Sequence, residues 1–170
     1  MTEIIEHFCE AALNMAKDVF YIDLDYSDES IQSLEQILDQ LFTYCQKLAD
    51  EGKFISNRRI QEMWDTLSFV SELFGEEDVE PIDEGLLSES SLWLISKIWG
   101  SYLGEVLRIK YGGDWTDFIQ VEEKTTLVLN VKDIQIVPAA KVFKRLTNGP
   151  EDNVWKFYKV LCIQLQNIIS

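Results

Sequence analysis

Residues 106–121, which read VLRIKYGGDWTDFIQV, contain the point at which the periodicity of the chain changes. Before the double glycine Gly112-Gly113, apolar residues recur every three or four positions, as on the buried face of a helix. After it the period falls to two, which is typical of strands. The sequence therefore predicts a helix that ends at the glycines and is followed by a small sheet, which gives an α+β fold.

Three short strands are predicted after the glycines, at residues 115–121, 125–131 and 134–137. Lys132-Asp133 is expected to join the last two in a tight turn, and Pro138 to end the third. Because the connections are short, an antiparallel meander is the simplest topology.

About four helices are expected before the sheet and two after it. Their apolar stripes place them near residues 5–19, 27–52, 56–75, 88–112, 139–147 and from Pro150 onward. Ser27 is the expected N-cap of the second helix, and residues 21–26 form an extended connector. Gly100 and Gly104 predict a notch on the fourth helix for the close approach of another element. We expect the helices to cover one face of the sheet.

The 170 residues fit a single domain, 1–170, with 46% hydrophobic residues to build a core. Cys9, Cys45 and Cys162 lie far apart in apolar stripes, which indicates buried, reduced thiols and a reducing compartment. The first residues lack the pattern of a secretory signal, and no stretch approaches the ~20 apolar residues that cross a bilayer. The expected location is the cytoplasm.

The net charge of −15 is unevenly distributed along the chain. Residues 1–90 hold 22 acidic and 5 basic side chains, whereas residues 91–170 hold 8 and 10. The acidic half would repel nucleic acid and anionic membranes, and it would attract a basic protein. The candidate partner face lies in the linker 75–85 and comprises Glu76, Glu77, Asp78, Glu80, Asp83 and Glu84. Solubility alone is the competing explanation for the charge.

Several chemistries are disfavoured by the residues present. His7 is the only histidine, and the sequence has no turn motif that would present a nucleophilic serine. A catalytic triad is therefore not expected. One histidine and three dispersed cysteines do not make a structural zinc site. No phosphate-binding glycine loop is present, and no cofactor is expected. Asp23 and Asp25 could bridge a hard cation or simply cap the following helix.

Glu105 is the most specific candidate for a site residue because it borders the apolar stripe of the fourth helix. A partly buried carboxylate must be paired, and the candidate partners are Arg108 or Lys144 with Arg145. A ligand-binding role for Glu105 is the alternative to such an ion pair. Trp115 is expected to anchor the core.

Several short motifs occur together over roughly residues 20–160. They are Leu24-Asp25-Tyr26-Ser27, Gly100-Ser101-Tyr102-Leu103-Gly104-Glu105, Gly112-Gly113-Asp114-Trp115, Pro138, Lys144-Arg145-Leu146 and Asn148-Gly149. The set resembles an uncharacterised family of bacterial domains with the pattern LDYS…GxYxGE…GGxW…P…KRLxNG. The resemblance implies a stand-alone or tandem cytosolic module, in some cases in a toxin-immunity-like context. It implies no catalytic residue.

Two functions remain open from the sequence. The first is a non-catalytic protein-binding module, immunity-like or regulatory, that uses its acidic face against a basic protein. The second is a small-ligand binder or enzyme with a pocket near Glu105, Trp115, Lys144 and Arg145.

Overall fold

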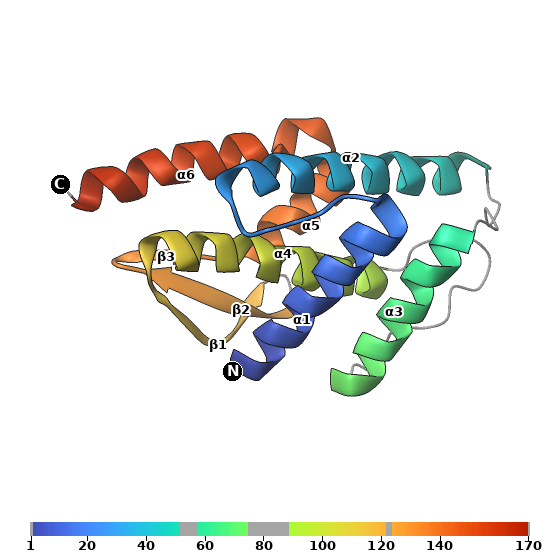
Figure 1. Cartoon of the computed structure of the whole chain (residues 1–170), viewed down its shortest axis with the longest axis horizontal. Coiled ribbons are helices and arrows are strands. Elements are labelled where there is room, and N and C mark those ends of the chain that lie inside the picture. The colour runs from blue at the N-terminus through green and yellow to red at the C-terminus, as the bar shows by residue number, and fades with distance from the viewer. Residues whose placement is uncertain (1, 52–57, 75–88, 122–123, 170) are drawn as a thin grey trace.

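The helix that ends at Gly112-Gly113 is the central element of the fold. In the computed structural model, which describes residues 2–51, 58–74, 89–121 and 124–169, this helix is α4 (Figure 1). The elements are α1 (Thr2–Met15), the π-helical turn η1 (Ala16–Phe20), α2 (Asp28–Glu51), α3 (Arg58–Phe74), α4 (Glu89–Tyr111), β1 (Asp114–Val121), β2 (Lys124–Val131), β3 (Ile134–Ile136), α5 (Pro138–Asn148), the 3-10 turn η2 (Pro150–Asp152) and α6 (Val154–Ile169). The predicted α+β class is confirmed.

The molecule is layered around α4. Figure 1 shows α2 and α6 above α4, the sheet below it, α1 crossing in front of it, and α3 beside α1 on the right. Side chains on nearly all sides of α4 are buried between Ser91 and Leu107, and Trp99 and Tyr102 are fully enclosed. The helix therefore has no wide polar face. Its buried surface extends further around the helix than the apolar stripe that the sequence predicted. Ile109, which the stripe included, is 57% exposed.

The predicted notch on α4 is confirmed at both glycines. A Cβ atom on Gly100 would lie 2.6 Å from the Cα and N atoms of Ala139, so the backbones of α4 and α5 are in direct contact there. A Cβ on Gly104 would lie 2.3 Å from the indole ring of Trp115. Gly100 thus allows α5 to pack closely against α4, and Gly104 allows Trp115 at the start of β1 to do the same.

The sheet is the predicted meander, with strand order β1-β2-β3 and both pairs antiparallel. Lys132 takes a positive φ of 56° in the turn before β3, as a tight hairpin turn requires. β3 ends at Ile136, one residue before the predicted end, because Pro138 begins α5. Side chains on both faces of β2 are buried from Thr126 to Leu129, so this strand is covered more fully than expected.

The first helix continues into a π-helical turn that the sequence did not indicate. Ala16 and Val19 remain buried in this turn, and the turn ends at Tyr21, which has a left-handed φ of 57°. π-Turns inside helices often occur at functional sites. The chain then runs without regular structure to Asp28, which agrees with the expected connector.

Two helix starts show how polar side chains replace missing backbone partners. Ser27 is confirmed as a cap of α2, since its Oγ accepts a hydrogen bond from the amide of Ser30 at 3.2 Å. The predicted start of the last helix at Pro150 is wrong. The Asn153 side chain accepts from the amide of Lys156 at 2.8 Å, which caps α6 after a separate turn.

All three cysteines are free, as expected. Cys9 and Cys162 are buried, whereas Cys45 is only half-buried. Burial raises the pKa of the Cys9 thiol and that of Cys45 to about 12, so both are neutral thiols at physiological pH. Among the described residues, no helix is both long and apolar enough to cross a membrane.

Asp28 joins the start of α2 to α4 and α6, and it gives the first testable prediction. Its carboxylate accepts hydrogen bonds from Lys110 Nζ and from the hydroxyl of Tyr158, which hold the pKa of Asp28 below its usual value. A carboxyl with a depressed folded-state pKa stabilises the fold above its unfolded pKa and loses this contribution as pH falls. Asp28→Asn should therefore destabilise the protein at neutral pH and cost progressively less below about pH 4.

Urea unfolding at neutral pH and at about pH 3 checks this expectation. Asp133→Asn, in the exposed β2–β3 turn, is the matched control. A cost of Asp28→Asn that is the same at both pH values would contradict the role of the carboxylate charge.

Candidate functional site

Glu105 lies on α4 and is held by two hydrogen-bond donors. Arg108 forms a two-point pair with it, with Nε 2.8 Å from Oε1 and Nη2 3.0 Å from Oε2. The indole Nε1 of Trp115 also donates to Oε1 at 2.6 Å. The expected pairing with Arg108 is therefore confirmed. Trp115 packs against the core, as expected of an anchor, but it also fixes the Glu105 carboxylate.

Lys144 and Arg145 do not join Glu105. Arg145 is 1% exposed, and its guanidinium binds Glu35 at 2.7 Å and Asp39 at 2.6 Å, both on α2. Lys144 is exposed on α5. The grouping of all four residues in one pocket is corrected here: α5 turns Arg145 toward α2, and the sequence does not say which neighbour a helix face meets.

A pocket of about 410 Å³ opens beside the Glu105–Arg108 pair, between α1, α4 and the start of β1. This volume lies within the usual range for ligand pockets. The polar part of its lining includes Glu6 and Glu10 from α1 and Asp114 from β1. Its apolar part comes from Ile5, Cys9, Leu13, Tyr26 and Trp115. We call this space the Glu105 pocket.

The Glu105 pocket carries an excess of negative charge. Its described lining has four carboxylates, Glu6, Glu10, Glu105 and Asp114, against the single guanidinium of Arg108. The hydrogen bonds that Arg108 donates to Glu105 raise the pKa of Arg108, so the guanidinium stays charged. Since Arg108 already pairs with Glu105, the other three carboxylates are available to attract a cation.

The thiol and the hydroxyl beside the Glu105 pocket are poorly suited to act as nucleophiles. Burial keeps the Cys9 thiol neutral, and burial also raises the pKa of the Tyr26 hydroxyl. A nucleophile needs the opposite change, a lowered pKa or an adjacent base. Glu105 accepts hydrogen bonds from two side chains, those of Arg108 and Trp115. Neither the Cys9 thiol nor the Tyr26 hydroxyl is therefore an activated nucleophile.

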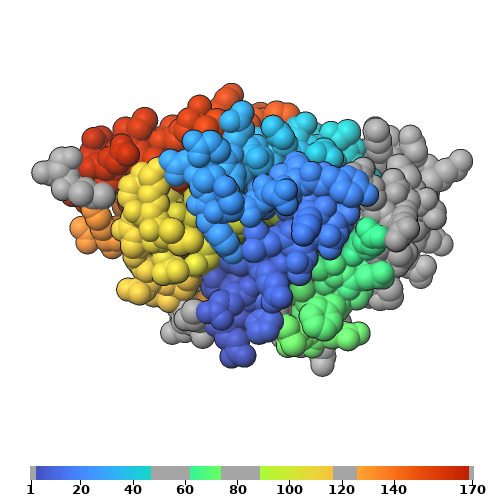
Figure 2. Space-filling view, viewed as in Figure 1, coloured from blue at the N-terminus to red at the C-terminus, as the bar shows by residue number. Residues whose placement is uncertain are grey.

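A second hollow lies on the other side of α1. It has a volume of about 820 Å³ and is lined by residues of α1, η1 and α3, among them the three carboxylates of Asp18, Glu62 and Asp65 and one basic side chain, Lys17. Asn14 lines both hollows, so the two meet at α1. Figure 2 shows this surface from the front, with α1 between α3 and the rest of the molecule. We use the name α1 acidic face for the carboxylates of the two hollows other than Glu105, which is paired with Arg108: Glu6, Glu10, Asp18, Glu62, Asp65 and Asp114.

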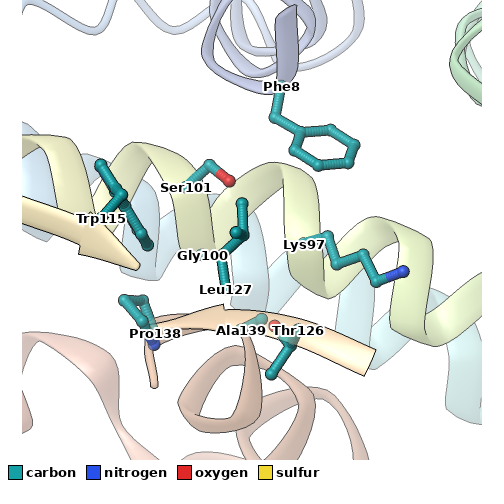
Figure 3. A pocket seen from close by; sticks show the side chains of 9 residues that line it. All are labelled: Phe8, Lys97, Gly100, Ser101, Trp115, Thr126, Leu127, Pro138 and Ala139. Atoms are coloured by element: carbon teal, nitrogen blue, oxygen red, sulfur yellow. The ribbon is translucent and has the colours of Figure 1, made fainter. Parts of the chain in front are cut away.

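A third cavity is too small to bind a ligand. It lies under α4 and is lined by Phe8, Ser101, Trp115, Pro138 and other residues shown in Figure 3. Its volume of about 10 Å³ matches no more than one water-sized group. Lys97 extends along its edge and points away from Trp115 (Figure 3).

The remaining sequence candidates do not form a site in the described structure. His7 lies on α1 with its Nδ1 2.7 Å from the carbonyl oxygen of Glu3. Hydrogen bonds from the side chain of Ser27 and from its backbone amide, the latter at 3.0 Å, lower the pKa of Asp25, which lies just before the start of α2. Among the described residues, no group of three His, Cys, Asp or Glu side chains could hold a metal ion. The candidate partner face at Glu76, Glu77, Asp78, Glu80, Asp83 and Glu84 lies outside the described residues.

Sequence reasoning missed Glu6, Glu10 and Asp114. Glu3, Glu6 and Glu10 recur at the same three-to-four spacing as the apolar stripe of α1, so a charged face was visible in the sequence. The place of Asp114 was not visible, because it depends on how β1 leaves α4.

Comparisons with protein-family models, with curated proteins and with solved structures found no match to this chain. The resemblance to a bacterial domain family therefore stays a prediction.

Proposed function

We propose that this chain is a non-catalytic protein-binding module, immunity-like or regulatory, that binds a basic protein through the α1 acidic face. One observation carries the proposal: the Glu105 pocket and the second hollow meet at α1, and both are lined mainly by carboxylates among their charged groups. Complementary charge of this kind accelerates encounter and selects the partner.

Three further features support this function. Glu105 and Arg108 pair with each other and the Cys9 thiol is neutral, which favours binding over chemistry. The same negative charge would repel nucleic acid and anionic membranes. The free thiols favour a reducing compartment, and we place the function in the cytoplasm.

Titration against lysozyme, a basic protein, at low and high salt tests the proposal. The affinity should fall steeply as salt screens the charges. The double variant Glu6→Gln/Glu10→Gln should weaken binding by about tenfold, which corresponds to ~1.4 kcal/mol. Lysozyme with acetylated lysines serves as the control partner with reduced positive charge, and it should bind more weakly.

A matched variant separates a specific face from net charge. Asp133→Asn/Glu151→Gln removes the same two charges from exposed positions in the C-terminal half. It should leave the affinity nearly unchanged. An affinity that does not depend on ionic strength, or an equal loss from both double variants, would contradict binding through the α1 acidic face.

A further inference from the structure

The Glu105 pocket has an apolar floor as well as charge. Ile5 and Cys9 are 2% and 4% exposed, and the partly buried Leu13 and Tyr26 complete the apolar part of the lining. A small inorganic cation would gain nothing from such a floor. The methylene stem of a lysine or arginine side chain packs well on it, because these side chains bury their stems while their charged heads remain in polar surroundings.

The charges of the pocket are arranged for a cationic head. Two nitrogens of Arg108 bind the two oxygens of Glu105, so this pair is close to neutral as a unit. Glu6, Glu10 and Asp114 have no ion-pair partner among the described residues. Charge-assisted hydrogen bonds from an ammonium or guanidinium group to these carboxylates would be stronger than those between neutral groups.

Part of the pocket wall is held in place by contacts within the protein. The amide of Tyr26 donates to the hydroxyl of Tyr102 at 2.9 Å, and the two rings stack with centroids 4.9 Å apart. Trp115 and Arg108 hold the Glu105 carboxylate from two sides. Such preorganisation lowers the entropic cost of binding. The Tyr26 ring offers an aromatic surface to a cation.

We propose that the Glu105 pocket takes the side chain of one lysine or arginine, with its stem on the apolar floor and its cationic head among Glu6, Glu10 and Asp114. This inference rests on the proposed function, since the basic partner supplies the side chain. It goes further because it assigns one partner side chain to one defined pocket, in place of a general charge attraction. A few such buried side chains contribute most of the binding energy in most interfaces.

The test is an NMR titration of the full ¹⁵N-labelled chain with three probes. Nα-acetyl-lysine methylamide and Nα-acetyl-arginine methylamide carry the cationic head, and Nα-acetyl-norleucine methylamide carries a similar stem without it. The two cationic probes should shift the amides of Glu10, Asn14 and Gly113 with a dissociation constant of about 1 mM. The norleucine probe should bind at least about tenfold more weakly. The stronger of the two cationic probes identifies the side chain.

A substitution that fills the pocket without changing the net charge is the second test. Asn14 is exposed and lines the pocket, so Asn14→Trp should cover it and abolish the shifts without altering net charge. Gln36→Trp, at an exposed position on α2, is the control and should change nothing. The inference is overturned if neither cationic probe shifts these amides, if norleucine binds equally well, or if Asn14→Trp leaves binding intact.

The two proposals fail separately. If salt-dependent binding to lysozyme is unaffected by Asn14→Trp, the acidic face stands and the pocket inference is overturned. If the cationic probes bind the pocket but basic proteins do not bind the chain, the proposed function is overturned and the ligand class of the pocket stands.

Discussion

Replacing Arg145 with methionine is expected to lower the free energy of unfolding by about 4 kcal/mol, because removing one partner of a buried ion pair leaves the other uncompensated. Arg145 is 1% exposed, and Glu35, its partner on α2, is 12% exposed. Glu35 also accepts a hydrogen bond from the amide of Val154 at 2.7 Å, so the same carboxylate connects α2, α5 and α6. Urea unfolding followed by circular dichroism measures the loss.

Two further variants show whether the buried charge is the cause. Asp39→Asn removes the partner that is 59% exposed and should cost less than about 1 kcal/mol. Adding Glu35→Leu to Arg145→Met should recover part of the loss, because no unpaired charge is then left inside. If Arg145→Met costs no more than Asp39→Asn, the buried pair does not hold these helices together.

The second large effect is expected at Gly100, where Gly100→Val should cost about 3 kcal/mol through overpacking. Its Cβ would fall 2.6 Å from backbone atoms of Ala139 and 2.9 Å from the carbonyl carbon of Pro138. These are backbone atoms, so the contact is relieved only if α5 moves away from α4. Thermal and urea unfolding measure the cost, and a loss of near-UV dichroism would report the altered packing.

Gly112 provides the control for Gly100. It ends α4 with a φ of 75°, and a Cβ there would meet nothing within 4 Å. Asparagine tolerates the left-handed region, so Gly112→Asn should cost less than about 1 kcal/mol. Comparable losses at the two positions would mean that close approach of α5 is not the reason for glycine at position 100.

The sequence indicated which residues of the site pair within one helix, but it did not indicate which distant residues join them. Glu105 and Arg108 lie three residues apart on a helix, so their pairing follows from helical geometry alone. Trp115 joins them because Gly112-Gly113 turns the chain and Gly104 leaves room for the indole ring. Arg145 was assigned to the wrong group because helical spacing gives its position on α5 but not the element opposite.

The distribution of charge shows the same division. The excess of acid in residues 1–90 is a property of the sequence, and it already favoured a basic partner. Which carboxylates lie together depends on the crossing of α1 over α4 and on the direction of β1. That crossing brings Glu6 and Glu10 to the same hollow as Asp114, more than 100 positions away in the chain.

The sequence by itself determined the α+β class, the order of strands, the turn at Lys132-Asp133 and the glycine end of α4, because each depends on periodicity or local backbone geometry. The tertiary structure alone decided the rest. It buried Arg145 against α2, enclosed α4 on nearly all sides and formed the Glu105 pocket between α1, α4 and β1. These depend on which faces of distant segments meet, and packing between such segments leaves no periodic pattern in a single chain.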